Sequence, residues 1–139
     1  MSEDCLFCKI ARGDLPARKV YEDDDVVAFL DVNPLSRGHT LVIPREHAER
    51  LDDMSSDAAW TKALEIAPAV QEAVDADALN VGVNDGSEAG QEVPHVHVHV
   101  VPRYEGDGGG PIHALMPEPA GLDDDEMDEI EDAVRSRLG

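Results

Sequence analysis

The chain of 139 residues has few basic residues, few aromatic residues and only two cysteines. Its 11 lysines and arginines face 31 aspartates and glutamates, which gives a formal net charge of −20. Duplex nucleic acid and anionic lipid are bound by clustered lysine and arginine, so this composition argues against both as partners. Two cysteines are also too few for a secreted domain stabilised by disulfides.

Long apolar runs are missing as well. No run approaches the ~18 residues needed to span a bilayer. The first residues lack the basic start and apolar stretch of a secretory signal, so we expect a cytoplasmic protein. The length and the 42% hydrophobic content predict a single domain over residues 1–139, with its core at about 5–110.

The excess of acidic residues allows two interpretations. The first is simply an acidic, highly soluble protein. The second is adaptation to a very salty cytoplasm, because at molar salt the screening length falls to ~3 Å and dense acidic charge repels itself little. We favour the salt-adapted interpretation.

The apolar pattern mixes strands and helices. It predicts strands over residues 19–22, 26–32, 39–43, 79–83 and 95–101, and helices over 5–12, 55–76 and 123–138. Pro68 is expected to kink or split the second helix, and Trp60 is expected in the core. Four glycines in residues 105–111 indicate a flexible segment. The pattern favours an α+β fold with a largely antiparallel sheet and no domain boundary.

The most informative segment alternates histidine with valine from residue 95 to residue 100. Alternate side chains of a strand point to opposite faces, so His95, His97 and His99 should share one face. Three uses fit such a strip: nucleophilic attack by an imidazole, a metal site, and packing. Packing explains three imidazoles in strict alternation poorly, but the spacing alone leaves catalysis and metal binding equally open.

The surrounding residues resemble the histidine-triad family. His95 to Val101 reads as the family signature, His-φ-His-φ-His-φ-φ with φ apolar. Residues 28–34 and 38–44 are similar to the family's earlier strands, 83–91 to the loop before the triad, and 5–10 to the N-terminus of its zinc-carrying members. The resemblance covers residues 5 to about 110. Pro102 and Arg103, which follow the triad, occur in a subset of members.

The resemblance implies an α+β fold whose antiparallel sheet continues across a homodimer. It implies a nucleotide hydrolase or transferase acting at the α-phosphate, with His97 as the nucleophile that forms a covalent nucleotidyl-histidine. His99 would hydrogen-bond the phosphate and the leaving atom, and His39 would support that network.

The same resemblance implies four substrate-binding residues. Asp31 matches the position that binds the ribose hydroxyls, and Asn84, Gly90 and Gln91 match the phosphate-side loop. One position departs from the family pattern: Glu92 stands where serine or threonine often touches the phosphate. His113 receives no role.

Cys5 and Cys8 form a C-x-x-C pair that could be half of a zinc site, a redox pair or two unrelated thiols. A thioredoxin-like role needs a preceding strand, and none is predicted here. The family resemblance implies His47 and His95 as two further ligands, which would complete a closed, structural Cys₂His₂ zinc site.

Three functions follow from these patterns. The leading one is hydrolysis of nucleoside phosphoramidates or dinucleoside polyphosphates. The alternative is a nucleotide-binding sensor or adaptor whose turnover is incidental. A metallohydrolase that uses the three histidines as ligands is the third, and it conflicts with the use of His95 in the structural zinc site.

Overall fold

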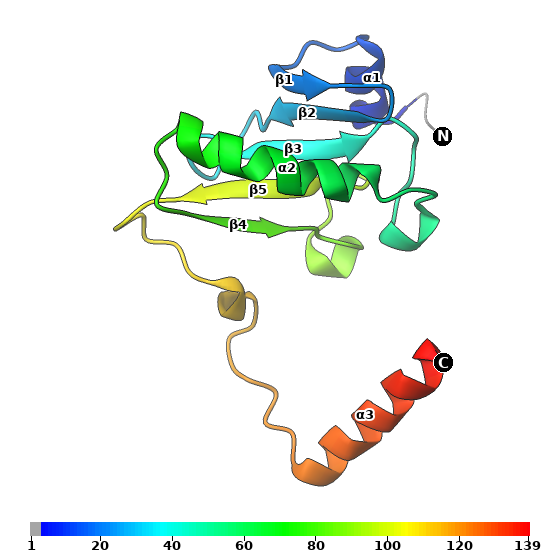
Figure 1. Ribbon diagram of the computed structural model, residues 1–139. Helices are drawn as coiled ribbons and strands as arrows, with labels where there is room; N and C mark the ends of the chain where they lie inside the picture. The colour runs from blue at the N-terminus through cyan, green and yellow to red at the C-terminus, as the bar shows by residue number, and fades with distance from the viewer. Residues whose placement is uncertain (1–3) are drawn as a thin grey trace. The chain divides into compact units, whose positions relative to one another are not determined.

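The computed structural model describes residues 4–139 (Figure 1). The chain divides after Gly109 into a larger compact unit and a smaller C-terminal unit, residues 110–139. The larger unit carries the sheet, two α-helices and all the predicted site residues. None of the described helices is long and apolar enough to cross a membrane.

Five strands form one antiparallel sheet in the order β1-β2-β3-β5-β4. Their bounds are β1 Lys19–Glu22, β2 Val26–Leu30, β3 Thr40–Pro44, β4 Ala78–Gly82 and β5 Val98–Arg103. Strands β2 and β3 are buried along almost their whole length, as expected for β-branched runs in the middle of a sheet. The predicted α+β fold with an antiparallel sheet is confirmed.

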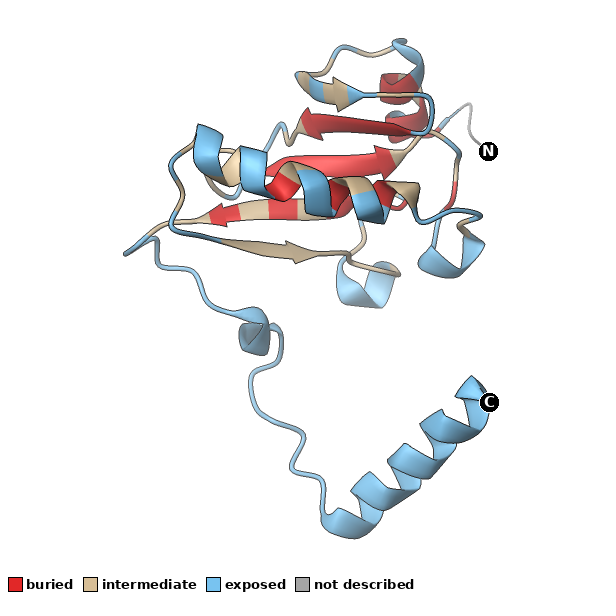
Figure 2. Cartoon of the chain, in the orientation of Figure 1, coloured by how far each residue is buried: buried red, intermediate tan, exposed pale blue. Residues whose placement is uncertain are grey.

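The sheet has a helix on each face, and the buried residues lie between these layers (Figure 2). Helix α1 (Leu6–Arg12) packs on one face against Val27, Phe29 and Leu41. Helix α2 (Ala58–Ala73) packs on the other face against Val26, Ala28, Val42, Val98 and Val100. The two groups come from alternate positions of the same strands, as the period of two requires.

Helix α2 is shorter than the predicted 55–76 and differs from its prediction in two further respects. Pro68 lies inside one continuous helix of 16 residues and does not split it. Trp60 is 41% exposed rather than in the core, because the residues facing the sheet are Ala59, Ala63 and Ala67, at spacings of four. These small residues let the helix backbone approach the sheet closely, and Trp60 lies one position away from their row.

Strand β5 begins at Val98, three residues later than predicted. The backbone of the preceding residues is bonded outside the ladder: Val96 N donates to Ala48 O at 2.7 Å, and His95 N donates to Val93 O at 2.8 Å. The alternation of side chains nevertheless persists. His97 contacts Phe7 on the α1 face, whereas Val98 and Val100 lie in the core beneath α2.

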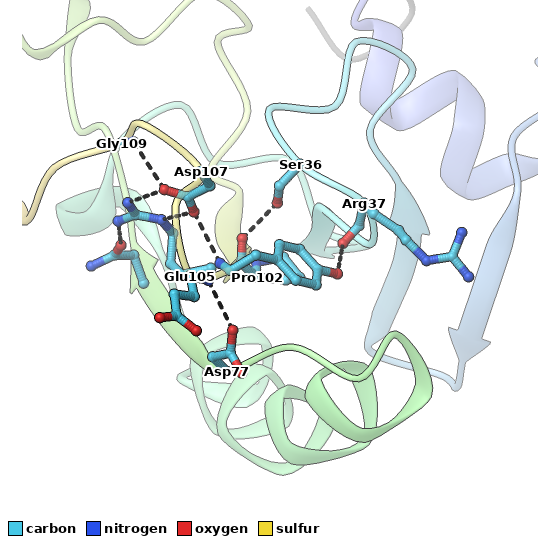
Figure 3. Close-up of polar contacts among 10 residues, drawn as sticks. Ser36, Arg37, Asp77, Pro102, Glu105, Asp107 and Gly109 are labelled. Carbon is cyan, nitrogen blue, oxygen red and sulfur yellow. Dashed lines mark hydrogen bonds and ion pairs between the residues drawn. The ribbon is translucent and has the colours of Figure 1, made fainter.

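In the glycine-rich segment after β5, Asp107 is the centre of a group of hydrogen bonds (Figure 3). The Asp107 carboxylate accepts hydrogen bonds from the Arg103 guanidinium at 2.9 Å, from Tyr104 N at 3.0 Å and from Gly109 N at 2.9 Å. These donors hold the pKa of Asp107 well below its usual range, the Arg103 hydrogen bond most strongly. The sequence pattern showed the glycines but not the carboxylate that organises them.

Two further bonds tie the start of this segment to the loop before β3. Tyr104 Oη donates to Arg37 O at 2.8 Å, and Ser36 Oγ donates to Pro102 O at 2.7 Å (Figure 3). The loop over residues 33–38 is therefore anchored to the end of β5.

The smaller unit contains a short 3₁₀ turn (Ile112–Leu115) and helix α3 (Asp124–Leu138), which confirms the predicted C-terminal helix. Asp123 caps α3 through a reciprocal capping box with Glu126. Acidic residues occupy its first turn, and Arg135 and Arg137 its last, in agreement with the helix dipole.

Candidate active site and metal centre

The pairing of β3 with β5 brings together histidines that are 60 residues apart in the chain. His39 lies directly before β3 and His99 lies in β5, opposite Leu41. His39 Nε2 is 3.0 Å from His99 Nδ1, and the rings of His97 and His99 lie with centroids 4.9 Å apart. The three residues predicted to be catalytic thus form one contiguous cluster.

The backbone defines which ring nitrogen of His97 carries the proton. His97 Nδ1 lies 2.7 Å from His95 O, and a carbonyl only accepts, so Nδ1 carries the hydrogen. The neutral ring then has its lone pair on Nε2, the nitrogen available for nucleophilic attack. Phe7 of α1 meets the ring at 86° with a centroid separation of 5.0 Å, which restrains its orientation.

A backbone donor likewise defines the protons on His39 and His99. Leu35 N donates to His39 Nδ1 at 3.1 Å, so a neutral His39 carries its hydrogen on Nε2. That hydrogen faces His99 Nδ1, which must accept it, and His99 therefore carries its own hydrogen on Nε2. His99 Nε2 is buried and has no hydrogen-bond partner among the described residues. This series of hydrogen bonds therefore ends in an unused N–H donor.

Burial favours the neutral form of His99 and of His39. Desolvation first, and then the neighbouring His97 and His39, together lower the pKa of His99 to about 4. The pKa of His39 is also lowered, chiefly by burial, while the Asp31 carboxylate opposes that shift. Neutral His99 is a hydrogen-bond donor near pH 7 without carrying a buried charge.

The lowered pKa of His99 predicts a stability that falls as the pH drops from about 6.5 towards 4. In that window the unfolded chain binds a proton that the folded chain refuses, so the free energy of unfolding decreases with falling pH. After discounting for partial solvent exposure, we expect His99 to account for ~1–2 kcal/mol.

This dependence can be measured by thermal unfolding at about pH 6.5 and about pH 5.0, above the range where most carboxylates titrate. We expect the drop in Tm between these two pH values to be smaller in His99→Asn than in the wild type. Equal drops would contradict the assignment.

Asp31 lies at the edge of the histidine cluster. Its Oδ1 accepts from Asn33 N at 2.9 Å, and its Oδ2 lies 3.7 Å from His39 Nε2. Ligand atoms of Asp31, His39 and His99 lie within 4.8 Å of one another, close enough for a metal ion. A metal on His39 Nε2 would move the proton to Nδ1, where it would meet the Leu35 N–H head-on. At these three residues the geometry therefore favours a hydrogen-bonded chain over a bound metal ion.

The predicted phosphate-side residues lie in the loop that follows β4. Asn84 Nδ2 would lie 3.8 Å from a Cβ added at Gly90, so these two residues are neighbours. Gly90 has a φ of 95°, which favours glycine and turns the chain back towards Asn84. Gln91 makes hydrogen bonds within the protein, and Glu92 is exposed.

Beside this cluster, the four predicted metal ligands come together on the α1 face. Their ligand atoms lie within 4.8 Å of one another. Cys5 Sγ lies 3.3 Å from His95 Nδ1, and Cys8 Sγ lies 3.3 Å from His47 Nδ1 and 3.5 Å from His95 Nδ1. Tetrahedral zinc, with Zn–S of about 2.3 Å and Zn–N of about 2.0–2.1 Å, holds such ligands about 3.5 Å apart. The donor set and its spacing fit zinc.

The surroundings of the four ligands also suit a cation. His95 Nε2 donates to Pro44 O at 2.8 Å, which leaves Nδ1 without a hydrogen and directed at the two sulfurs. Burial and the neighbouring Cys5 raise the pKa of the Cys8 thiol to about 11. Two adjacent buried sulfurs become thiolates only if a positive charge joins them, and a metal ion supplies it.

Three groups in these sites were not predicted: Leu35 N, Pro44 O and the Phe7 ring. The first two are backbone groups, which leave no mark in the pattern of side chains. Phe7 could have been noticed as the apolar residue between the two cysteines, but a ring contact with His97 needs the helix and the strand to be placed together.

Comparisons with known proteins agree with this arrangement. The HIT domain, the domain of the histidine-triad family, matches residues 12–106. An uncharacterised HIT-like protein of Methanocaldococcus jannaschii is 50% identical over 106 residues, which are 75% of this chain and 82% of that protein. An adenosine 5′-monophosphoramidase of Schizosaccharomyces pombe is 40% identical over 118 residues, which are 82% and 88% of the two chains.

Solved structures show the same similarity. A crystal structure from Streptococcus mutans has a TM-score of 0.88 and 39% identity, covering 98% of this chain and 86% of that one. A zinc-bound histidine-triad protein of Mycobacterium smegmatis has a TM-score of 0.71 and 35% identity, covering 96% and 99%. With the domain match, the sequence relatives and the fold in agreement, the chain belongs to the histidine-triad family.

Proposed function

We propose that this protein is a nucleotide hydrolase that acts at the α-phosphate through a covalent nucleotidyl-histidine on His97. The observation that carries the proposal is the pair of proton positions in the histidine cluster. His97 has its lone pair on Nε2, and the adjacent His99 has an unused Nε2–H donor. A nucleophile and a donor for developing negative charge therefore lie side by side.

The reaction would proceed in two displacements. The His97 Nε2 lone pair attacks the α-phosphorus, forming a P–N bond while the bond to the leaving group breaks. The leaving group departs with the electron pair, stabilised by His99 Nε2–H. An amine nitrogen gains a proton from solvent as its bond to phosphorus breaks, whereas a phosphate leaving group needs none. Water then forms a P–O bond, the electron pair returns to Nε2, and the nucleoside monophosphate and a proton are released.

The remaining predicted contacts fit around this centre. Asp31 would accept hydrogen bonds from the ribose hydroxyls, because a carboxylate suits a diol. Asn84 and Gly90 would bound the phosphate side of the site. Since the chain is strongly acidic, neutral histidines and loop N–H groups must supply the local donors for an anionic substrate.

The relatives support this class of reaction. The S. pombe relative is an adenosine 5′-monophosphoramidase, and a nucleoside phosphoramidate is one of the two substrate classes we propose here. Dinucleoside polyphosphates are the other.

The function is tested by measuring AMP release from adenosine phosphoramidate and from diadenosine tetraphosphate in molar KCl. We expect catalytic turnover of at least one of them, and the faster substrate identifies the class. Tight nucleotide binding with no turnover of either would contradict the hydrolase and identify a nucleotide sensor.

We also propose that Cys5, Cys8, His47 and His95 hold a structural zinc ion. Support comes from the four ligand atoms lying within 4.8 Å of one another and from the zinc-bound relative of M. smegmatis. When bound, zinc would supply the positive charge that keeps both sulfurs as thiolates. We place the protein in the cytoplasm, whose reducing conditions keep the cysteines as thiols. We also propose that residues 1–139 act as one functional domain.

We further propose a homodimer in which the sheet continues from one copy to the next. The order of the strands leaves β1 and β4 as the edges of the sheet. Helix α3 supports association too, because Met127, Ile130, Val134 and Leu138 form a row that is between 45% and 83% exposed. An isolated helix of this length is marginal in water, and a second copy would cover the row.

Sedimentation equilibrium in molar KCl should therefore give twice the 15.0 kDa mass of one chain. Ile130→Glu is expected to weaken the association, whereas Ser136→Ala should leave it unchanged. A monomer at all concentrations would contradict the dimer.

The acidic composition supports a salt-adapted protein. We expect the Tm to rise by roughly 10 °C between dilute buffer and molar KCl, because salt screens the repulsion among the acidic groups. Matched melts in KCl and in sucrose separate charge screening from general stabilisation. An unchanged Tm would contradict the adaptation.

A further inference from the structure

The residues that follow His47 make hydrogen bonds at four consecutive positions, three of them to the phosphate-side loop and one to the triad segment. We call residues 47–51 the strap. Two of its carbonyls accept hydrogen bonds: Ala48 O from Val96 N, and Glu49 O from Gln91 Nε2, both at 2.7 Å. The strap thus binds both the end of the loop and the triad segment that follows it.

The other two positions of the strap bind the start of the loop. Asp85 Oδ1 accepts from Leu51 N at 2.9 Å and from Arg50 Nε at 3.1 Å. These donors lower the pKa of Asp85, the Leu51 N–H most strongly. A Cβ added at Gly86, whose φ is 104°, would lie 3.1 Å from the Arg50 guanidinium carbon, so the guanidinium lies directly against the loop backbone.

Gln91 uses both ends of its side-chain amide within the protein. Its Oε1 accepts from Gly86 N at 2.7 Å, and its backbone N donates to Gly86 O at 3.1 Å. Its Nε2 donates to Glu49 O and, at 3.1 Å, to Val93 O. Gln91 therefore closes the loop on itself and joins it to the strap. These intramolecular hydrogen bonds account for the position of the Gln91 side chain without the predicted contact to substrate.

The strap begins at a metal ligand, and the triad segment begins at another. His47 starts the strap, and His95 is followed by Val96, which the strap also binds. A single ion on the four ligands would therefore hold both sides of the substrate site: the nucleophile through His95 O, and the phosphate-side loop through the strap.

We propose that Gln91 and Asp85 are positioning residues, and that the metal centre holds the phosphate-side loop in place through the strap. This inference rests on the proposed zinc site and on the proposed hydrolase. It predicts that loss of a metal ligand loosens a loop that contains none of the ligands.

Amide hydrogen exchange of the full protein tests the coupling. We expect His47→Ala to lose zinc and to raise exchange over residues 84–91 by about tenfold or more, because local opening then needs fewer broken contacts. His47→Cys, which keeps a zinc ligand, should restore both zinc and protection. Amides of the β1–β2 hairpin, which packs on α1, report the general loss of stability, and exchange over residues 84–91 should rise by a larger factor than theirs.

A second variant keeps all four metal ligands. Gln91→Glu preserves the acceptor for Gly86 N but replaces the donor to Glu49 O with an oxygen. We expect exchange over residues 84–91 to rise while the zinc content stays at the wild-type level. In steady-state kinetics KM should rise about tenfold with kcat within about threefold, as for lost uniform binding. Glu88→Gln, an exposed exchange of the same size in the same loop, is the control.

The two variants together form a double-mutant cycle. If the strap connects the two sites, the effect of Gln91→Glu on loop exchange should shrink when His47→Ala has already released the strap. If the wild type holds zinc but loop exchange in both single variants equals that of the wild type, this inference fails while the zinc and hydrolase proposals stand. A wild type that holds no zinc would overturn the zinc proposal and the coupling with it.

Discussion

His97→Ala is expected to lower kcat/KM by at least about three orders of magnitude on the better of the two substrates, as removal of a covalent nucleophile generally does. The reason lies in the proton positions: His95 O holds the hydrogen on Nδ1, so Nε2 is the nitrogen left to attack. No other described side chain in the cluster offers a free unprotonated nitrogen, because Nδ1 of His39 and of His99 each accept a hydrogen bond.

The loss of activity in His97→Ala should come from the missing nucleophile and not from a change in the fold. His97→Ala should keep its zinc and bind a nucleotide with nearly the wild-type Kd, since the Asp31 and loop contacts remain. Acid quenching of wild-type turnover, followed by mass analysis, should find the nucleotidyl group on the peptide that contains His97. His113→Ala, in an exposed turn of the smaller unit, is the matched control and should retain full activity. Equal turnover by the His97 variant and the wild type would refute the nucleophile.

Removal of zinc is expected to lower the stability of the protein by several kcal/mol. A ligand present at about a thousand times its Kd stabilises the folded state by ~4 kcal/mol, and about 1 kcal/mol shifts the Tm of a domain of this size by a few degrees, so we expect a drop of roughly 10–20 °C. The site joins the N-terminal cap of α1 to the sheet, because Cys5 precedes α1 and His95 precedes β5.

The matched comparison is Cys8→Ser against the wild type, each before and after chelation. Chelation should lower the Tm of the wild type and leave that of the variant, already low, almost unchanged. Elemental analysis of protein purified without chelator should give one zinc per chain for the wild type. Absence of stoichiometric zinc would contradict the metal proposal and leave the His97 result to stand alone.

These two variants should affect different properties of the protein, which separates the catalytic role from the structural role. His97→Ala should remove turnover and spare stability, whereas Cys8→Ser should lower stability and reduce turnover only as far as the loop and the nucleophile shift. His95 belongs to both sites, through its side chain in one and its carbonyl oxygen in the other.

Much of the site could be predicted from the sequence because it depends on local repetition. The alternation in residues 95–100 predicts that the three histidines share one face, and it persists although β5 begins only at Val98. The C-x-x-C spacing and the apolar runs of β2 and β3 are equally local. These patterns, with the family resemblance, were enough to identify the antiparallel α+β fold and to propose the catalytic and metal residues.

Other features depend on which segments meet, and only the tertiary structure decides that. The proton on His95 is placed by Pro44 O and the proton on His99 by His39 Nε2, and these partners lie 51 and 60 residues away in the chain. The sequence does not show whether the Gln91 amide binds a phosphate or the strap. The hydrogen bond from Gln91 Nε2 to Glu49 O in the folded chain shows that it binds the strap. Side-chain periodicity predicts which face of a strand or helix a residue occupies. It does not predict the hydrogen-bond partner of that residue, because contacts between residues distant in sequence are determined by the packing of the whole sheet.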